Sequence, residues 1–194
     1  MIPHFTFCRA WYSSKRFNKM AGRGKPKKLD AEALWEYALR ALGQRAHSTG
    51  ELRQKLSRRA VSAAEVDATL AKLREYELTN DQKFSEAFAA ARLQNQGFGR
   101  LRVLRDLSSR RVGRTIAERA VEKTFGEVDE LTLIRRFLER RYRGKDLVEF
   151  LKEEKHLASV YRRLRTAGFT ANGSLSVLKG YSHEAQDWSD REDE

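Results

Sequence analysis

Residues 48–73 read STGELRQKLSRRAVSAAEVDATLAKL, and they give the clearest indication of the fold. This stretch contains two segments, Ser48-Thr-Gly-Glu51 and Ser62-Ala-Ala-Glu65, that fit the capping box of a helix N-terminus. In such a box the serine oxygen accepts a hydrogen bond from a first-turn amide, and the glutamate reaches back to the cap. Apolar residues follow each box at intervals of three and four, which places them on one helix face. The stretch therefore predicts two short amphipathic helices joined by a tight turn.

The chain contains no proline over the 168 consecutive residues from 27 to 194. The two prolines of the 194-residue chain are Pro3 and Pro26, and Leu, Ala, Arg, Glu and Lys dominate the sequence after Pro26. These residues favour helices, whereas proline removes a helix hydrogen bond, and no segment alternates as a strand does. We predict an all-α protein with short loops and helices near 31–45, 48–59, 62–77, 81–95, 99–110, 113–125, 127–142, 144–154, 156–167 and 171–180.

An apolar pattern recurs three times along the chain. Its four positions keep the intervals 4, 5 and 9, and successive copies are separated by 51 and then 57 residues. Each copy reads as a helix end, a turn with one apolar residue that plugs the core, and a new helix. Four such matches can arise by chance in a leucine-rich chain, but the matching turns favour a true repeat. The copies are Leu52, Leu56, Val61 and Leu70; Val103, Leu107, Val112 and Val121; and Val160, Leu164, Phe169 and Leu178.

Repeats of this length predict a curved array of three tandem three-helix modules, in which each module contacts only its neighbours. The third copy is longer by six residues, which we assign to an insert around 142–155. We expect the chain to divide into a basic, disordered arm, three modules and an acidic, disordered tail, at residues 1–29, 30–80, 81–126, 127–181 and 182–194.

Charge is distributed unevenly over the chain. The 39 basic and 27 acidic side chains give a formal net charge of +12. Residues 1–29 contribute +8, residues 30–181 contribute +9 and residues 182–194 contribute −5. A basic body of this size indicates a polyanionic partner, or a protein assembled on one. The acidic tail either solubilises the chain or competes with such a partner, and solubilisation is the simpler interpretation.

The basic residues recur on the second helix of each module and on the turn after that helix. At equivalent positions of a curved array they form one stripe, which can follow a phosphate backbone or an acidic protein surface. For any single member a solvated helix face is the alternative, but for the stripe as a whole we favour binding. The predicted binding residues are Arg53, Lys55, Arg58 and Arg59 in the first module, Arg100, Arg102, Arg105, Arg110 and Arg111 in the second, and Arg162, Arg163 and Arg165 in the third.

Two other groups are interpreted as structural. A second arginine cluster falls on more than one helix face, which indicates a solvated surface, and aromatic residues at helical spacing are assigned to the core. The first group is Arg135, Arg136, Arg140, Arg141 and Arg143, and the second is Tyr37, Phe84, Phe88, Phe125 and Phe137. Because aromatics are not interleaved with the stripe, base-specific readout and stacking-dominated single-strand binding are not expected.

No set of residues indicates catalysis. Gly22-Arg-Gly-Lys25 lacks the spacing of a phosphate-binding loop, and Gly97-Phe-Gly99 lacks the third glycine of a dinucleotide fingerprint. The four histidines are scattered, and the single cysteine, Cys8, permits a reducing, cytoplasmic location. No apolar run approaches the roughly 20 residues that span a bilayer. We expect no enzyme, no cofactor, no metal and no membrane partner.

Three blocks of the sequence resemble the bacterial RecX family of RecA regulators. The resemblance covers about residues 31–180, but the turn Arg59-Ala-Val61 lacks the family's usual glycine and the basic arm lies outside the pattern. The blocks are Tyr37-Ala-Leu-Arg-Ala-Leu with His47-Ser-Thr-Gly-Glu-Leu-Arg-Gln-Lys-Leu56; Leu78-Thr-Asn-Asp-Gln-Lys-Phe-Ser-Glu-Ala-Phe88 with Gly97-Phe-Gly-Arg-Leu-Arg102; and Tyr161-Arg-Arg-Leu-Arg-Thr-Ala-Gly-Phe169.

The resemblance implies a non-enzymatic, curved array that binds the RecA recombinase filament on single-stranded DNA. It implies modulation, mainly inhibition, of RecA's ATPase, strand exchange and co-protease functions in DNA recombination, DNA repair and the SOS response. We expect a monomer in the cytoplasm. The alternative is a direct, sequence-nonspecific DNA- or RNA-binding helical protein, which predicts tight binding to naked nucleic acid with a steep salt dependence. An unrecognised enzyme is a third hypothesis, with only a generic pool of Glu and Arg behind it.

Overall fold

The computed structural model describes residues 28–182, and this part of the chain is helical. Within it ten α-helices and one π-helical turn form, and no strand does; a single isolated bridge pairs Leu29 with Ala60. The predicted all-α fold is confirmed. The predicted basic arm, except for its last two residues, and the predicted acidic tail, except for Ser182, lie outside the described residues.

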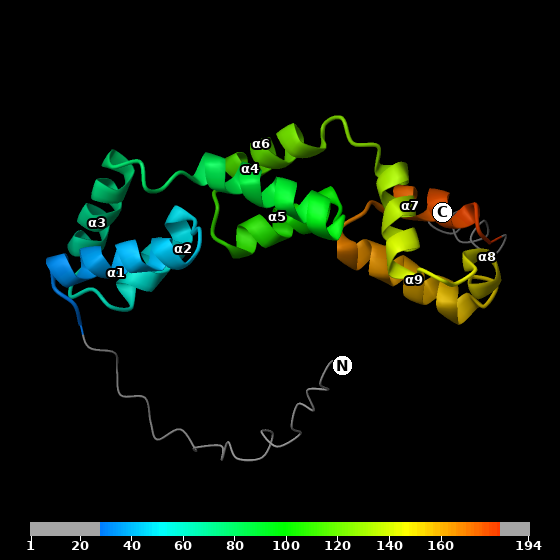
Figure 1. Ribbon diagram of the computed structural model, residues 1–194, viewed down its shortest axis with the longest axis horizontal. Coiled ribbons are helices and arrows are strands. Elements are labelled where there is room, and N and C mark those ends of the chain that lie inside the picture. Colours follow the sequence, from blue (N-terminus) through cyan, green and yellow to red (C-terminus); the bar gives the residue numbers. More distant parts are fainter. Residues whose placement is uncertain (1–27, 183–194) are drawn as a thin grey trace, which may run out of the picture.

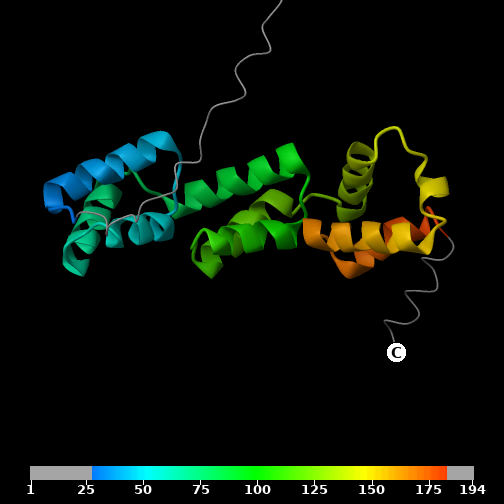
Figure 2. The same cartoon turned by 90° about the horizontal axis from the view of Figure 1, so that it is seen from below.

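The helices form three consecutive units. The units lie in a row that bends into a shallow arch in Figure 1 and looks straight in the perpendicular view of Figure 2. The first unit contains α1 (Ala31–Gln44), α2 (Thr49–Ser57) and α3 (Ala63–Glu75). The second contains α4 (Asp81–Ala91), the π-helical turn η1 (Arg92–Gln96), α5 (Arg100–Ser109) and α6 (Arg114–Phe125). The third contains α7 (Glu130–Arg141), α8 (Leu147–Phe150), α9 (Glu154–Ala167) and α10 (Ala171–Lys179).

Both predicted capping boxes are present. The Glu51 amide donates to Ser48 Oγ at 3.0 Å, and the Ser48 amide donates to Glu51 Oε2 at 3.4 Å. Ser62 and Glu65 make the same reciprocal pair, at 3.3 and 3.4 Å. Such caps stabilise a helix start by about 1 kcal/mol each. They therefore determine where α2 and α3 begin.

Each unit has a hydrophobic core of its own. Of the twelve repeat positions, ten are at most 2% exposed. They are Leu52, Leu56 and Leu70 in the first core, Val103, Leu107 and Val121 in the second, and Val160, Leu164, Phe169 and Leu178 in the third. Because short helices are marginal in isolation, these separate cores hold each unit together.

The prediction that Val61 fills the core is wrong. Val61 is 64% exposed, and Ala60, which is 3% exposed, packs in the first core instead. The corresponding turns of the second and third units contain a residue with positive φ, Arg111 at 60° and Gly168 at 93°. The first turn has no such residue, and its chain enters the core one position earlier. The absence of a left-handed residue, and not of a glycine as such, distinguishes the first turn from the other two.

The predicted helix over 144–154 is also wrong in extent. It shrinks to the four residues of α8, and α9 begins at Glu154. The turn between them brings Leu151 into the third core with no exposed surface. It also stacks the His156 ring on Phe150, with centroids 4.1 Å apart. A continuous helix over 144–154 would not allow both the burial of Leu151 and the stacking of Phe150 on His156, which explains why the helix breaks between α8 and α9.

Backbone hydrogen bonds form the centre of the joint between the second and third units. The amide of Gly99, the N-cap of α5, donates to the carbonyl of Ala167 at 2.9 Å. The Leu101 amide donates to the carbonyl of Gly168 at 3.1 Å. A Cβ atom on Gly168 would lie 2.1 Å from the backbone nitrogen of Arg102. The start of α5 thus lies directly on the α9–α10 turn.

The joint between the first and second units repeats this arrangement. Ser48, the N-cap of α2, donates through Oγ to the carbonyl of Arg110. A Cβ atom on Gly50 would lie 2.3 Å from the carbonyl oxygen of Arg111. In both joints the second helix of one unit begins on the left-handed turn of the next unit. The repeat in sequence is therefore also a repeat of the joint.

Candidate functional site

An open pocket of about 500 Å³ lies at the joint between the second and third units. Its walls come from η1 and α5 of the second unit and from α7 and α9 of the third. Four arginines and two aromatic rings contribute to the lining, and no acidic residue of the described chain does. These six residues are Arg102, Arg140, Arg141, Arg163, Phe98 and Phe137.

Among the described residues, Arg102 is the one pocket arginine that has an acidic partner. Its Nε lies 2.9 Å from Asp106 Oδ1, and its guanidinium lies 5.3 Å from the centroid of the Phe98 ring. Asp106 also pairs with Arg92, whose Nε lies 3.4 Å from Oδ2. The Asp106 carboxylate therefore pairs with two guanidinium groups, and it neutralises the charge of Arg102 only in part.

The other three arginines carry charge that no described carboxylate balances. Arg140 donates to the backbone carbonyls of Asn95, at 3.1 Å, and of Gln96. These carbonyls orient the guanidinium without neutralising it. Arg141 and Arg163 make no ion pair or hydrogen bond through their side chains with other residues in the range 28–182. The pocket is consequently an electropositive site whose arginine-rich wall spans two units.

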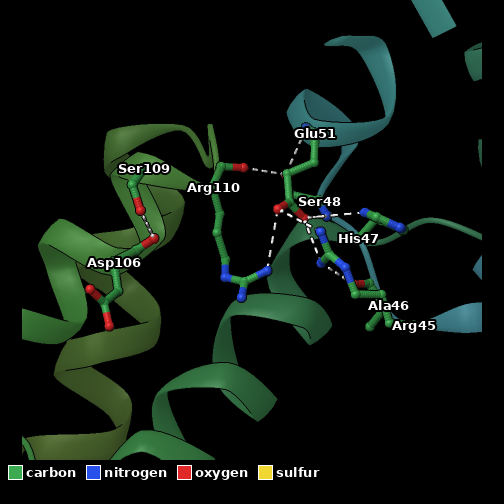
Figure 3. Close-up of polar contacts among 8 residues, drawn as sticks. All are labelled: Arg45, Ala46, His47, Ser48, Glu51, Asp106, Ser109 and Arg110. Carbon is green, nitrogen blue, oxygen red and sulfur yellow. Dashed lines mark hydrogen bonds and ion pairs between the residues drawn. The ribbon is translucent and has the colours of Figure 1, made fainter. Parts of the chain in front are cut away.

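A second polar cluster stabilises the joint between the first and second units (Figure 3). Glu51 Oε1 lies 3.1 Å from Arg45 Nη2 and 3.2 Å from Arg110 Nη1, which reaches across from the second unit. Glu51 Oε2 lies 3.4 Å from Nδ1 of the buried His47. The Arg110 guanidinium also lies over the Phe88 ring, 4.8 Å from its centroid. Glu51 therefore connects both units.

Burial controls the charge state of this cluster. It lowers the pKa of His47, and the nearby charges of Arg45 and then Lys55 act in the same direction. Burial alone would raise the pKa of Glu51, but Arg45 and Arg110 outweigh it and hold that pKa below its ordinary value. At neutral pH the cluster therefore has a neutral imidazole beside a charged carboxylate. The charged Glu51 carboxylate can therefore pair with Arg110 across the joint, which is a structural role.

Seven of the predicted binding residues make contacts within the protein. On α5, Arg100 pairs with Glu122 at 2.6 Å, and Arg105 Nη2 donates to the carbonyl of Thr166 at 3.2 Å. Arg102 and Arg110 pair with acidic residues as described above. The other three contacts are Arg53 with Asp67 at 2.6 Å, Arg59 over the Tyr37 ring at 5.5 Å, and Arg165 Nη1 with the carbonyl of Phe169 at 2.6 Å.

The remaining five predicted residues make no side-chain hydrogen bond or ion pair within the described part of the chain. They are Lys55, Arg58, Arg111, Arg162 and Arg163. Of all twelve predicted residues, the pocket brings together Arg102 and Arg163. The predicted set therefore divides into cations that contact other described residues and cations whose side chains make no such polar contact.

Of the six arginine and aromatic residues that line the pocket, four are not among the predicted binding residues. The sequence pattern assigns Arg140 and Arg141 to solvated surface and Phe137 to the core, and it gives no role to Phe98, yet all four line the pocket. Phe137 does pack against the third core as predicted. At this joint the fold places the Phe98 ring beside Arg102, one of the residues of the predicted stripe. The spacing of α7 gives no indication of which of its faces meets the second unit.

Neither a membrane span nor a metal cluster is found among the described residues. No helix within 28–182 is long and apolar enough to cross a membrane. In the same range no three His, Cys, Asp or Glu side chains are grouped so as to hold a metal ion.

Comparison with known proteins gives matches along most of the chain. Residues 35–73 match the first three-helix domain of RecX, and residues 80–121 match the second. The regulatory protein RecX of Halorhodospira halophila is 33% identical over 142 residues, which cover 73% of this chain and 84% of that relative. The regulatory protein RecX of Syntrophotalea carbinolica is 26% identical over 137 residues, which cover 71% and 88%.

A solved structure shares the fold. The crystal structure of RecX from Lactobacillus salivarius superposes with a TM-score of 0.58 and 18% identity. The match covers 78% of this chain and 96% of that one. At this identity the likeness concerns the fold alone.

Proposed function

The chain belongs to the RecX family of regulatory proteins, and we propose that it regulates a RecA-type recombinase filament on single-stranded DNA. Proteins of this family are regulators and not enzymes. The proposed action is inhibition of RecA's ATPase, strand exchange and co-protease functions in recombination, repair and the SOS response. In this proposal the protein acts as a monomer in the cytoplasm.

The observation that supports this proposal is the row of three separately cored units connected by one repeated joint. A filament presents the same surface at every subunit, and an elongated array can contact several subunits at once. Linked weak contacts gain avidity without any one of them being strong. A ligand that binds one filament state better than another shifts the population toward that state. Regulation of this kind requires no catalysed reaction.

The available cations support an anionic or DNA-coated partner. Lys55, Arg58, Arg111, Arg162 and Arg163 lie on all three units and have side chains that are not engaged in described polar contacts. Removing them from water on binding breaks no internal ion pair. They are the best candidates for the interface among the twelve predicted residues.

The test is the single-strand-dependent ATPase rate of RecA, titrated with the full chain and two charge-matched variants. The interface variant is Lys55→Glu/Arg58→Glu/Arg162→Glu, and the control is Arg119→Glu/Arg135→Glu/Arg136→Glu, exposed residues outside the predicted stripe. We expect the wild type to inhibit below one molecule per RecA subunit, and the interface variant to lose about tenfold in potency. The control keeps its potency. An unchanged rate at saturating wild type, without filament binding, would refute the proposal.

A second candidate function is direct binding of nucleic acid without RecA. The uncompensated arginines of the pocket and the net charge of +9 over residues 30–181 favour it. It predicts tight binding to naked DNA with a steep salt dependence, because each neutralised phosphate releases counterions. Weak binding with a shallow slope, alongside strong filament binding, would exclude it.

A further inference from the structure

The arginine pocket between the second and third units has more positive charge than the fold requires. Arg140, Arg141 and Arg163 line it, and no described carboxylate pairs with them. Like charges around one pocket repel each other, and an anion between them removes that repulsion. The planar guanidinium presents two donors that match the oxygens of a phosphate or a carboxylate. The charge therefore predicts an anionic ligand.

The rest of the lining restricts the class of anion. Phe98 and Phe137 are half-buried beside the arginines, which gives the pocket apolar surface. A nucleotide complements both the arginines and the apolar surface, because it has a charged phosphate and a flat ring. An acidic peptide lacks the obligatory flat ring.

From these contacts we propose that this pocket holds one nucleotide of a single-stranded nucleic acid. The phosphate lies on Arg141 and Arg163, and the base packs against Phe98 and Phe137. The pocket is open to solvent, so a nucleotide within a strand can reach it. This proposal rests on the proposed regulation of a DNA-bound filament and names the part of that complex that the third unit contacts.

Binding at this place would also connect two units. Arg163 and Arg141 belong to α9 and α7 of the third unit, whereas Phe98 and Gln96 belong to the second. A nucleotide that contacts both sides stabilises the angle between the units. The array would then be stiffer on DNA than free in solution.

The test measures fluorescence anisotropy of a labelled oligothymidylate with the full-length chain, in the absence of RecA. The pocket variant is Arg141→Ala/Arg163→Ala, and the control is Arg135→Ala/Arg136→Ala, which removes the same charge from exposed positions of α7 outside the pocket. Arg140 is left intact because it holds the carbonyls of Asn95 and Gln96. We expect the pocket variant to bind about tenfold more weakly and the control within about threefold of the wild type.

Two competitors identify the ligand class. An abasic strand of equal length tests the contribution of the base, and we expect it to bind the wild type more weakly but the pocket variant equally. Poly-glutamate of equal charge is expected to compete poorly with oligothymidylate. Equal losses in the pocket and control variants, or equal competition by poly-glutamate, would overturn the proposal.

The RecA ATPase assay keeps the two proposals separate. If the pocket variant binds DNA as the wild type does, the nucleotide site is refuted even when wild type inhibits RecA. If the pocket variant loses DNA binding while wild type leaves RecA unaffected, the nucleotide site stands and filament regulation is refuted.

Discussion

Replacing Gly168 by alanine should loosen the joint between the second and third units. Gly168 has φ of 93°, and an added Cβ would lie 2.1 Å from the nitrogen and 2.4 Å from the Cβ of Arg102. The chain offers a matched control in Gly144, which has φ of 81° and nothing within 4 Å of an added Cβ. Both variants place alanine in the left-handed region, but only Gly168→Ala also forces two units apart.

The magnitude follows from these contacts. A left-handed conformation costs a non-glycine residue about 1–2 kcal/mol, and this cost applies to both variants. In Gly168→Ala the start of α5 must also move away, which breaks the hydrogen bonds from the Gly99 and Leu101 amides. Each of these contributes about 1 kcal/mol. We therefore expect a loss of about 3–4 kcal/mol for Gly168→Ala and about 1–2 kcal/mol for Gly144→Ala.

The assay is urea unfolding followed by circular dichroism, together with small-angle scattering of the folded variants. We expect Gly168→Ala to change the scattering profile and Gly144→Ala to leave it as in wild type. Equal free energies of unfolding for the two variants, within about 0.5 kcal/mol, would show that the close approach at Gly168 has no energetic consequence. The hydrogen bonds of Gly99 and Leu101 would then not hold the two units together.

Gly50→Ala should destabilise the other joint by about 2 kcal/mol in the same assay, because its Cβ meets the Arg111 carbonyl at 2.3 Å. Arg111→Gly should stabilise the chain by about 1 kcal/mol, since it relieves a positive φ of 60°; a loss in urea unfolding would contradict this. Leu138→Ala, in the fully buried third core, should cost about 2–5 kcal/mol, measured by thermal unfolding. Acid should destabilise the fold in two steps. Because the pKa of the buried His47 is lowered in the folded protein, the unfolded chain binds a proton more readily as pH falls below 6.5, and stability decreases. Because the pKa of Glu51 is also lowered, the stability that its charged form contributes is lost as pH falls below about 4.5. His47→Gln should remove the first step from the pH dependence of unfolding.

The helices are predictable because their signals are local. The boxes at Ser48 and Ser62, and the apolar residues after them, act over one or two helical turns. The errors occur where a tertiary contact outweighs local preference. The apolar pattern predicts that Val61 lies in the core, but the conformation of the turn buries Ala60 and exposes Val61. The expected helix over 144–154 breaks because Leu151 packs in the third core.

The candidate site is less predictable than the fold. The pattern of basic residues in the sequence includes Arg102 and Arg163, which line the pocket. It also includes Arg110, which forms an ion pair with Glu51 at the other joint. Whether a surface arginine is available depends on the acidic groups that the fold brings near it. That information is distributed over distant parts of the chain.

The helical character of this protein, the repetition of its units and its basic body can all be predicted from the amino-acid sequence. These properties depend on composition and on spacings of a few residues, which are visible without a structure. Which cations face each other depends instead on how the units pack. Arg102 and Arg141 lie 39 positions apart, and they line one pocket because the α9–α10 turn seats the third unit on the start of α5. The geometry of that joint, set by the hydrogen bonds of Gly99 and Leu101, brings the residues together.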